Sequence, residues 1–175
     1  MNDKSLSKFI SLILRHKPET IGIKLDENGW ADVNELLAGV KINFSTLERI
    51  VRENDKQRFT FNDDKTKIRA NQGHSLKVDI ELEEKFPPQF LYHGTIERFA
   101  NSIDTQGILK GKRLYVHLSA DIETAKKVAA RRDGNSVIYK ISAQIMQGDG
   151  YKFFQSQNGV WLTDFVPPKY FTRLN

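Results

Sequence analysis

The stretch VDIELEEKFPP, residues 78–88, divides this chain of 175 residues. Apolar and acidic residues alternate in its first half, as in a strand with one solvent-facing side, and it ends on two prolines. Its acidic part, residues 79–85, carries a net charge of −3, whereas the residues before it carry +3 and those after it +5. We therefore expect two domains, residues 1–85 and 86–175.

The composition of the chain restricts the class of protein. Hydrophobic residues make up 39% of the sequence, enough to fill a core, and the absence of cysteine excludes disulfides and thiol catalysis. No apolar run reaches the roughly 20 residues of a membrane span, and the polar residues 1–8 do not resemble a signal peptide. We expect a cytoplasmic protein, and the net charge of +5 is compatible with a phosphate-bearing partner.

Residues 1–85 are predicted to hold three helices followed by a β-hairpin. The first helix begins at Asn2 or Asp3 and ends before Pro18, the next two are capped by Asp32 and Ser45, and the hairpin strands are 58–61 and 66–70. This outline is typical of a winged helix, a module that binds nucleic acids or proteins.

Residues 86–175 are predicted to be mostly strands with two helices. The strands are 90–92, 114–118, 137–141, 151–154 and 160–163, and the helices run from 96 to about 105 and from Ser119 or Asp121 to just before Gly134. Arg131 and Arg132 then lie in the last turn of the second helix. Because strands and helices do not alternate regularly, we expect an α+β fold and not a parallel nucleotide-binding sheet.

The residues that could carry chemistry are basic and polar. The chain lacks the phosphate-loop, dinucleotide, nucleophile-elbow and zinc-protease motifs, and its four histidines are too scattered to predict a metal site. Arg69 opens a polar run, residues 70–75, which suits an oxyanion because arginine binds phosphate oxygens in a bidentate fashion. Arg15 and His16 fit either a functional site or a helix end, where cations are favoured.

Five short motifs occur in order along nearly the whole chain. They are LRH (14–16), RANQGHS (69–75), LYHGT (91–95), VHLS (116–119) and NGVWLT (158–163). Each motif alone is weak, but together they resemble the RNA 2′-phosphotransferase family, called KptA in bacteria.

The resemblance implies a two-lobed enzyme. Residues 1–85 would form a winged-helix lobe that binds RNA, and residues 86–175 an ADP-ribosyltransferase-like lobe that binds NAD. Members of this family remove an internal 2′-phosphate from RNA, classically at a tRNA splice junction, with NAD as co-substrate and without a metal. The phosphate first displaces nicotinamide to give an RNA 2′-phospho-ADP-ribose intermediate, which then yields 2′-OH RNA and ADP-ribose 1″,2″-cyclic phosphate.

The resemblance also implies roles for single residues. Catalysis is assigned to Arg15, His16, Arg69 and Arg131, NAD binding to His93, Gly94, Thr95, His117 and Ser119, and substrate binding to Gln72 and His74. Arg132 is the alternative to its neighbour Arg131, and His16 fits either phosphate binding or proton transfer. Taken alone, His93 and His117 also fit core histidines that are hydrogen-bonded within a sheet. Val160 stands where many ADP-ribosyltransferases have a catalytic Glu, which disfavours ordinary protein ADP-ribosylation.

Two rival functions remain open. One is an ADP-ribosyltransferase that caps the phosphate ends of nucleic acids and stops after the first step. The other is a winged-helix regulator whose second lobe senses a ligand; it predicts a basic recognition helix, but residues 46–54 are neutral. No heptad pattern or long apolar edge demands a partner, so we expect a monomer.

Overall fold

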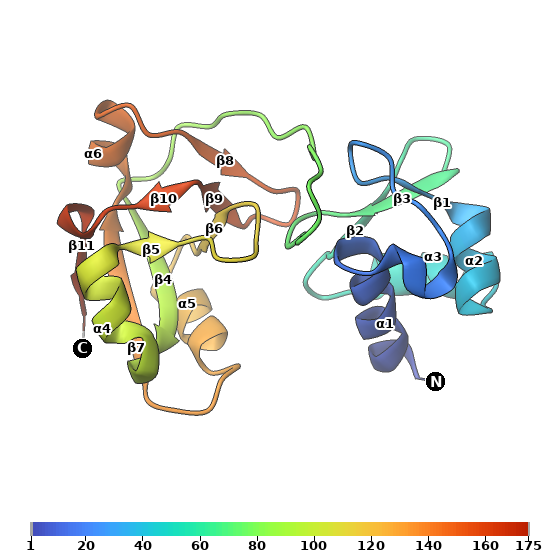
Figure 1. Cartoon of the computed structure of the whole chain (residues 1–175), viewed down its shortest axis with the longest axis horizontal. Coiled ribbons are helices and arrows are strands. Elements are labelled where there is room, and N and C mark those ends of the chain that lie inside the picture. The colour runs from blue at the N-terminus through green and yellow to red at the C-terminus, as the bar shows by residue number, and fades with distance from the viewer. Residues whose placement is uncertain (1, 175) are drawn as a thin grey trace. The chain divides into compact units, whose positions relative to one another are not determined.

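The structure is a computed structural model that describes residues 2–174. The chain divides into two compact units, Met1–Glu81 and Leu82–Asn175 (Figure 1). The strand expected at the start of the 78–88 stretch is wrong, because residues 78–83 form no ladder. The Asp79 amide instead donates to the Glu27 carbonyl at 2.8 Å, and the Asp79 carbonyl accepts from the Asn28 side chain at 2.7 Å. These contacts tie the stretch to a turn of the first unit.

Side-chain caps set the starts of the helices in the first unit. The helices are α1 (Asp3–Arg15), the 3₁₀ helix η1 (Pro18–Ile21), α2 (Val33–Val40) and α3 (Phe44–Glu53). Asn2 caps α1 and Asp32 caps α2, as predicted. The prediction of Ser45 as the third cap is wrong, because Asn43 accepts a hydrogen bond from the Thr46 amide and α3 begins two residues earlier.

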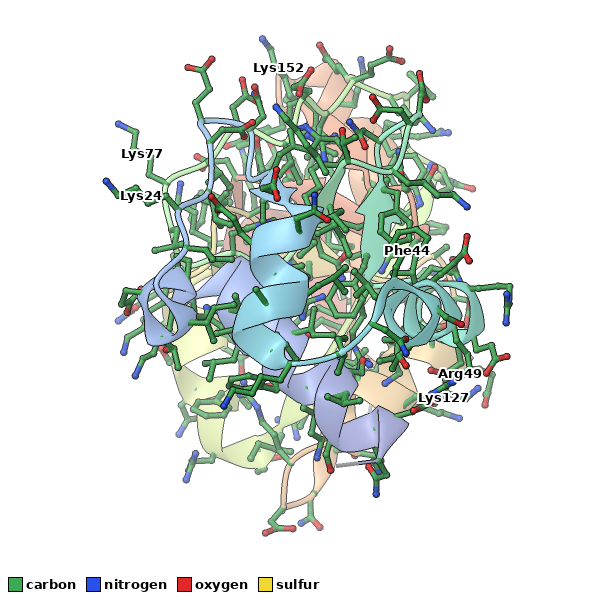
Figure 2. The ribbon with its side chains drawn as sticks, turned by 90° about the vertical axis from the view of Figure 1, so that its right-hand side faces the viewer. Lys24, Phe44, Arg49, Lys77, Lys127 and Lys152 are labelled. Carbon is green, nitrogen blue, oxygen red and sulfur yellow. The ribbon has the colours of Figure 1, made fainter. Side chains whose placement is uncertain are left out.

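A small antiparallel sheet completes the first unit. Its strands β1 (Ala31–Asp32), β2 (Phe59–Phe61) and β3 (Lys67–Ala70) pair in the order β1-β3-β2. Ile68 on the central strand is fully buried in the core under the helices. Figure 2 shows Phe44 and Arg49 on α3, where the Phe44 ring lies 5.8 Å from that of Phe61 and the Arg49 guanidinium donates twice to the Asp3 carboxylate. The predicted three helices and hairpin are therefore present.

The second unit combines short antiparallel sheets with helices. Its strands are β4 (Phe90–Ile96), β5 (Ile108–Leu109), β6 (Val116–Leu118), β7 (Ser136–Ser142), β8 (Phe153–Gln155), β9 (Trp161–Thr163), β10 (Phe165–Val166) and β11 (Phe171–Arg173), and its helices are α4 (Glu97–Gln106), α5 (Ile122–Ala129), α6 (Ala143–Gly148) and the 3₁₀ helix η2 (Pro168–Tyr170). The sheet orders are β11-β7-β4, β6-β9-β8 and β10-β5. This mixture confirms the α+β class.

The second unit differs from the prediction in several places. The short strands β5, β10 and β11 were not predicted, and β4 continues to Ile96, four residues beyond its expected end. The helix α5 is capped by Asp121, but it ends at Ala129 and not just before Gly134. Arg131 and Arg132 therefore lie in the turn after the helix, where their amides bond to the carbonyls of Val128 and Ala129. The short helix α6 was not predicted, and the side chain of its N-cap residue, Ser142, makes no capping hydrogen bond. No helix within residues 2–174 is long and apolar enough to cross a membrane.

Close packing of α5 on β4 depends on Gly94. A Cβ atom on this residue would lie 1.9 Å from the carbonyl oxygen of Ala125, so only glycine allows the helix backbone to approach the strand so closely. Ala125 and Ala129, on the same face of α5, are buried and pack with Ile138 of β7. This contact fixes the start of the turn that carries Arg131.

Candidate functional site

The end of α1 and the loop after β3 meet through hydrogen bonds. Arg15 is the last residue of α1 and His16 its C-cap. The Ser75 amide donates to the Arg15 carbonyl at 3.0 Å, and the Ser75 hydroxyl lies 2.8 Å from Nδ1 of His16. Gly73, at a φ of 89°, passes against the Arg15 guanidinium. The structure thus brings the LRH and RANQGHS motifs together.

Arg69 is held by three different contacts. It lies on β3 and its guanidinium carbon is 4.2 Å from the centre of the Trp30 ring, a cation–π arrangement. Its Nη1 donates to the Asn28 carbonyl at 3.2 Å and to the Glu81 carboxylate at 3.3 Å. The Arg69 side chain is only 13% exposed, whereas that of Glu81 is 58% exposed. The arginine is therefore held in place, while its one acidic partner is in contact with solvent.

His74 is buried among these cations. It is 1% exposed, and within residues 2–174 neither of its ring nitrogens has a hydrogen-bond partner. Burial, followed by the charges of Arg15, His16 and Arg69, lowers the pKa of His74 to about 4. The imidazole is therefore neutral at pH 7, with a nitrogen lone pair and an N–H group that no atom of the described residues uses. The Oε1 atom of Gln72 is also buried and has no hydrogen-bond partner within residues 2–174.

Arg15, His16 and Arg69, here called the cation cluster, have the properties of an anion site. Their charges are close enough to suppress protonation of His74, and Glu81 is the carboxylate that offsets one of them. A bound oxyanion would lower the mutual repulsion of these cations and would accept hydrogen bonds from their N–H groups. The structure therefore brings together four of the predicted site residues of the first unit, the cation cluster and His74. The fifth, Gln72, is not part of this group.

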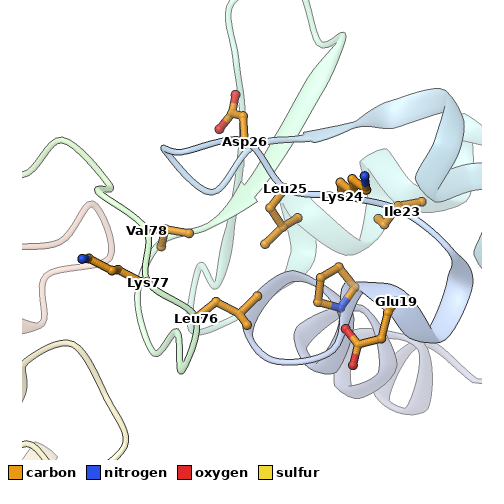
Figure 3. A pocket seen from close by; sticks show the side chains of 9 residues that line it. Glu19, Ile23, Lys24, Leu25, Asp26, Leu76, Lys77 and Val78 are labelled. Atoms are coloured by element: carbon orange, nitrogen blue, oxygen red, sulfur yellow. The ribbon is translucent and has the colours of Figure 1, made fainter.

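A separate pocket of about 380 Å³ lies in the first unit (Figure 3). Its floor is apolar, with Leu25, Leu76 and Val78 facing one another. It is lined by Pro18, Glu19, Ile23, Lys24, Leu25, Asp26, Leu76, Lys77 and Val78, so none of the predicted site residues belongs to it. Its two lysines are matched by two carboxylates, so the lining has no excess of positive charge that would attract an anion.

In the second unit, the two motif histidines lie on neighbouring strands. His93 is on β4 and His117 on β6, and Nδ1 of His93 lies 3.3 Å from the His117 carbonyl oxygen. The strands are also joined by the backbones of Tyr92 and Ser119, which exchange two hydrogen bonds. Burial lowers the pKa of His93, so this ring is neutral at pH 7. His93, His117 and Ser119 are therefore brought together.

An arginine that the motifs did not indicate belongs to the same group. Nη1 of Arg113 lies 3.1 Å from Nδ1 of His117, four residues along the chain. Burial and the charges of Arg131 and Arg132 lower the pKa of Arg113, which shows that the three guanidinium groups are neighbours. We call these three residues the arginine cluster.

No carboxylate of the described residues offsets the positive charges of the arginine cluster. Within residues 2–174, no ion pair joins any of its members to a carboxylate. Arg132 packs its guanidinium carbon 5.0 Å from the centre of the Phe99 ring, whereas no such ring contact is found for Arg131 in the described residues. Three like charges that have no carboxylate partner within residues 2–174 favour a bound anion.

Gly94 and Thr95 have structural roles that the structure shows directly. Gly94 allows the backbone of α5 to pack closely on β4. Thr95 is buried, and its backbone lies in the ladder between β4 and β7. NAD contacts by these two residues stay a prediction. Among the described residues, no three His, Asp or Glu side chains are grouped so that they could hold a metal ion.

Comparison with known proteins identifies the family. Residues 1–165 match the family described as RNA 2′-phosphotransferase, Tpt1/KptA family. A protein of Fusobacterium nucleatum named "Probable RNA 2′-phosphotransferase" is 57% identical over 174 residues, which cover 97% of each chain. Proteins with the same name from Flavobacterium johnsoniae and Escherichia coli K12 are 54% and 51% identical and are aligned over 94–95% of the chains. The chain therefore belongs to the RNA 2′-phosphotransferase, Tpt1/KptA, family.

Proposed function

We propose that this protein is an enzyme that transfers an internal 2′-phosphate from RNA to NAD. The products are 2′-OH RNA, nicotinamide and ADP-ribose 1″,2″-cyclic phosphate. The observation that carries the proposal is the cation cluster in the first unit, where Arg15, His16 and Arg69 lie around a buried neutral His74. Within residues 2–174, the ring nitrogens of His74 have no hydrogen-bond partner. Such a site suits a phosphate dianion better than a neutral ligand, and family membership supplies the reaction class.

The first step needs positioning more than acid–base catalysis. An oxygen of the RNA 2′-phosphate bonds to the anomeric carbon of the nicotinamide ribose, and the bond to nicotinamide breaks. The nucleophile is already an anion, and nicotinamide leaves as a neutral molecule, so no proton has to move. The cation cluster would bind and orient this phosphate and offset its charge, and the Glu81 carboxylate that pairs with Arg69 is exposed to solvent.

The second unit has groups that fit NAD. A dinucleotide presents two phosphate charges and ribose hydroxyl groups, and here the arginine cluster lies beside the His93 and His117 rings. Arginines would bind the pyrophosphate, and the neutral histidines and Ser119 would bind hydroxyl groups. When bound, NAD supplies the ADP-ribosyl group that accepts the phosphate.

Arg131 is the candidate for stabilising the second step. There the ribose 2″-hydroxyl attacks phosphorus and loses its proton, the bond from phosphorus to the RNA 2′-oxygen breaks, and that oxygen takes up a proton to give the 2′-OH. Negative charge on the crowded phosphorus must be offset, and a guanidinium is suited to this task. Arg131 is exposed in the turn after α5 and has no ring contact in the described residues, whereas Arg132 is packed on Phe99. This difference favours Arg131.

The test is to incubate the protein with NAD and an RNA that carries one internal 2′-phosphate. We expect equal amounts of nicotinamide and the cyclic phosphate, and none with a matched RNA that lacks the 2′-phosphate. Absence of both products with the phosphorylated RNA contradicts the proposal. Accumulation of an RNA-phospho-ADP-ribose adduct without cyclic phosphate would instead identify an ADP-ribosyltransferase that stops after the first step.

A further inference from the structure

The side-chain hydrogen bonds of Arg69 lie on one of its three guanidinium nitrogens. Nη1 donates to the Asn28 carbonyl at 3.2 Å and to the Glu81 carboxylate at 3.3 Å, so its two N–H groups meet two acceptors. Within residues 2–174, Nε and Nη2 of Arg69 make no hydrogen bond. The N–H groups of these two nitrogens lie side by side along one edge of the planar guanidinium. This Nε–Nη2 edge fits two oxygens of one phosphate group.

The turn formed by residues 26–30 supplies two of the three contacts of Arg69. The Asp26 side chain closes this turn, because it accepts hydrogen bonds from the amides of Asn28 and Trp30 at 2.9 Å each. The turn thereby presents the Trp30 ring to the face of the guanidinium, 4.2 Å from its carbon, and the Asn28 carbonyl to Nη1. The third contact, with Glu81, comes from a different segment of the chain.

Glu81 is held in an unusual backbone conformation. Its φ is 59°, in the left-handed region, which is unfavourable for a residue with a Cβ atom. The Glu81 amide donates to Oδ1 of Asp79 at 2.9 Å. The backbone of Asp79 is in turn bonded to Glu27 and Asn28, so the segment is tied to the turn that contacts Arg69. Such strain persists where the surrounding contacts enforce it, and it is concentrated at functional sites.

We infer that Glu81 is a positioning residue that holds Nη1 of Arg69, together with the Asn28 carbonyl, so that the Nε–Nη2 edge is left to bind the phosphate. The Arg69 side chain is only 13% exposed, so it has little freedom to meet a phosphate in another orientation. The identification of the ligand as the RNA 2′-phosphate rests on the proposed function. The assignment of the edges rests on the contacts of Arg69 alone.

The alternative role for Glu81 is that of a competitor. Its negative charge opposes phosphate binding, and in this role a phosphate would take the place of the carboxylate on Nη1. Two variants separate the roles, because Glu81→Gln and Glu81→Ala both remove the charge, but only glutamine keeps a side-chain oxygen that accepts a hydrogen bond. The difference between the two variants therefore measures the positioning of Arg69 without the effect of the charge.

The first test observes the Arg69 side chain by NMR, with methyl phosphate as the probe and without RNA or NAD. In ¹H–¹⁵N spectra, where the Arg69 signals are identified by their loss in Arg69→Lys, we expect methyl phosphate to shift the Nε and Nη2 protons and to leave the Nη1 protons in place. The Nη protons should give separate signals in the wild type and in Glu81→Gln. They should merge in Glu81→Ala, where the guanidinium rotates more freely. A shift of the Nη1 protons, no response to methyl phosphate, or equal spectra of the two variants overturns the inference.

The second test compares single-turnover rates with NAD and 2′-phosphorylated RNA. We expect Glu81→Ala to slow the reaction at saturating RNA about tenfold, the loss of one charge-assisted hydrogen bond, without a higher half-saturating RNA concentration. Glu81→Gln should keep most of the rate. The matched control is Glu83→Ala, which removes an equal charge from an exposed residue and should change neither rate nor spectra. Equal rates of the two Glu81 variants contradict the positioning role. A lack of turnover by the wild type contradicts the proposed function instead, and the methyl phosphate spectra then decide the positioning role by themselves.

Discussion

Replacing His74 by leucine should remove a large part of the acid sensitivity of this protein. His74 is 1% exposed and its pKa is lowered from the usual 6.5 to about 4, first by burial and then by Arg15, His16 and Arg69. The folded state therefore holds the imidazole neutral, whereas the unfolded chain protonates it near pH 6.5. As pH falls, protons bind to the unfolded state first. The contribution of neutral His74 to the free energy of unfolding is fully present above pH 6.5 and is lost as the pH falls toward 4.

The size of this effect follows from the difference between the two pKa values. One pKa unit corresponds to about 1.4 kcal/mol, so a shift to about 4 corresponds to roughly 3 kcal/mol once the pH is below both values. At pH 5, the protonated fraction of the unfolded state makes the loss about 2 kcal/mol relative to pH 7. This is a measurable part of the 5 to 15 kcal/mol, approximately, that stabilises a typical domain.

The assay is urea unfolding of the wild type and of His74→Leu at pH 7 and pH 5. We expect the free energy of unfolding of the wild type to fall by about 2 kcal/mol more than that of the variant. At pH 7 the variant should be at least as stable as the wild type, because leucine replaces ring nitrogens that are buried without a partner in the described residues. Equal pH dependence of the two proteins, or a ring titration of His74 by NMR with a midpoint near 6.5, would refute the reasoning.

Other substitutions test the remaining parts of the account. Arg69→Ala should slow single-turnover phosphate transfer by about 100- to 1000-fold, and Arg69→Lys should restore only part of the rate because lysine lacks the planar fork; a rate within a few-fold of wild type would contradict the assigned role. Arg131→Ala should slow product formation far more than it weakens RNA binding, while Arg132→Ala should do little, and the reverse order of rates would exchange the two assignments. Gly94→Ala should lower the free energy of unfolding by about 3 kcal/mol in thermal or urea denaturation, since its Cβ would lie 1.9 Å from the Ala125 carbonyl; an unchanged stability would show that α5 moves away at little cost.

Helix starts could be predicted from the sequence where a single capping side chain determines the first residue of the helix. Asn2, Asp32 and Asp121 accept the expected amide hydrogen bonds at the starts of their helices. The third helix start was misplaced because Asn43 and Ser45 are both good caps, and only the packing of Leu47 and Ile50 in the core decides between them. The turn after Ala129 likewise follows from packing on β4, which no local pattern indicates.

The candidate site was predictable where motifs mark it and not where contacts create it. The LRH and RANQGHS motifs pointed to Arg15, His16 and Arg69, and the structure joins them through Ser75 and around His74. The burial of His74 could not be foreseen, because it depends on how the loop after β3 folds back on α1. The sequence did not indicate Arg113, because a basic residue four positions before a histidine on a strand is not a recognisable motif. Its contact with His117 is created by the fold of the segment between them.

The most direct test of the central claim is to follow the phosphorus atom. RNA labelled with ³²P only at one internal 2′-phosphate is mixed with enzyme, with and without NAD. The account predicts that the label leaves the RNA only when NAD is present and is recovered in ADP-ribose 1″,2″-cyclic phosphate, and that Arg69→Ala transfers it far more slowly. Release of the label as inorganic phosphate without NAD, or retention of the label on the RNA, would contradict the account.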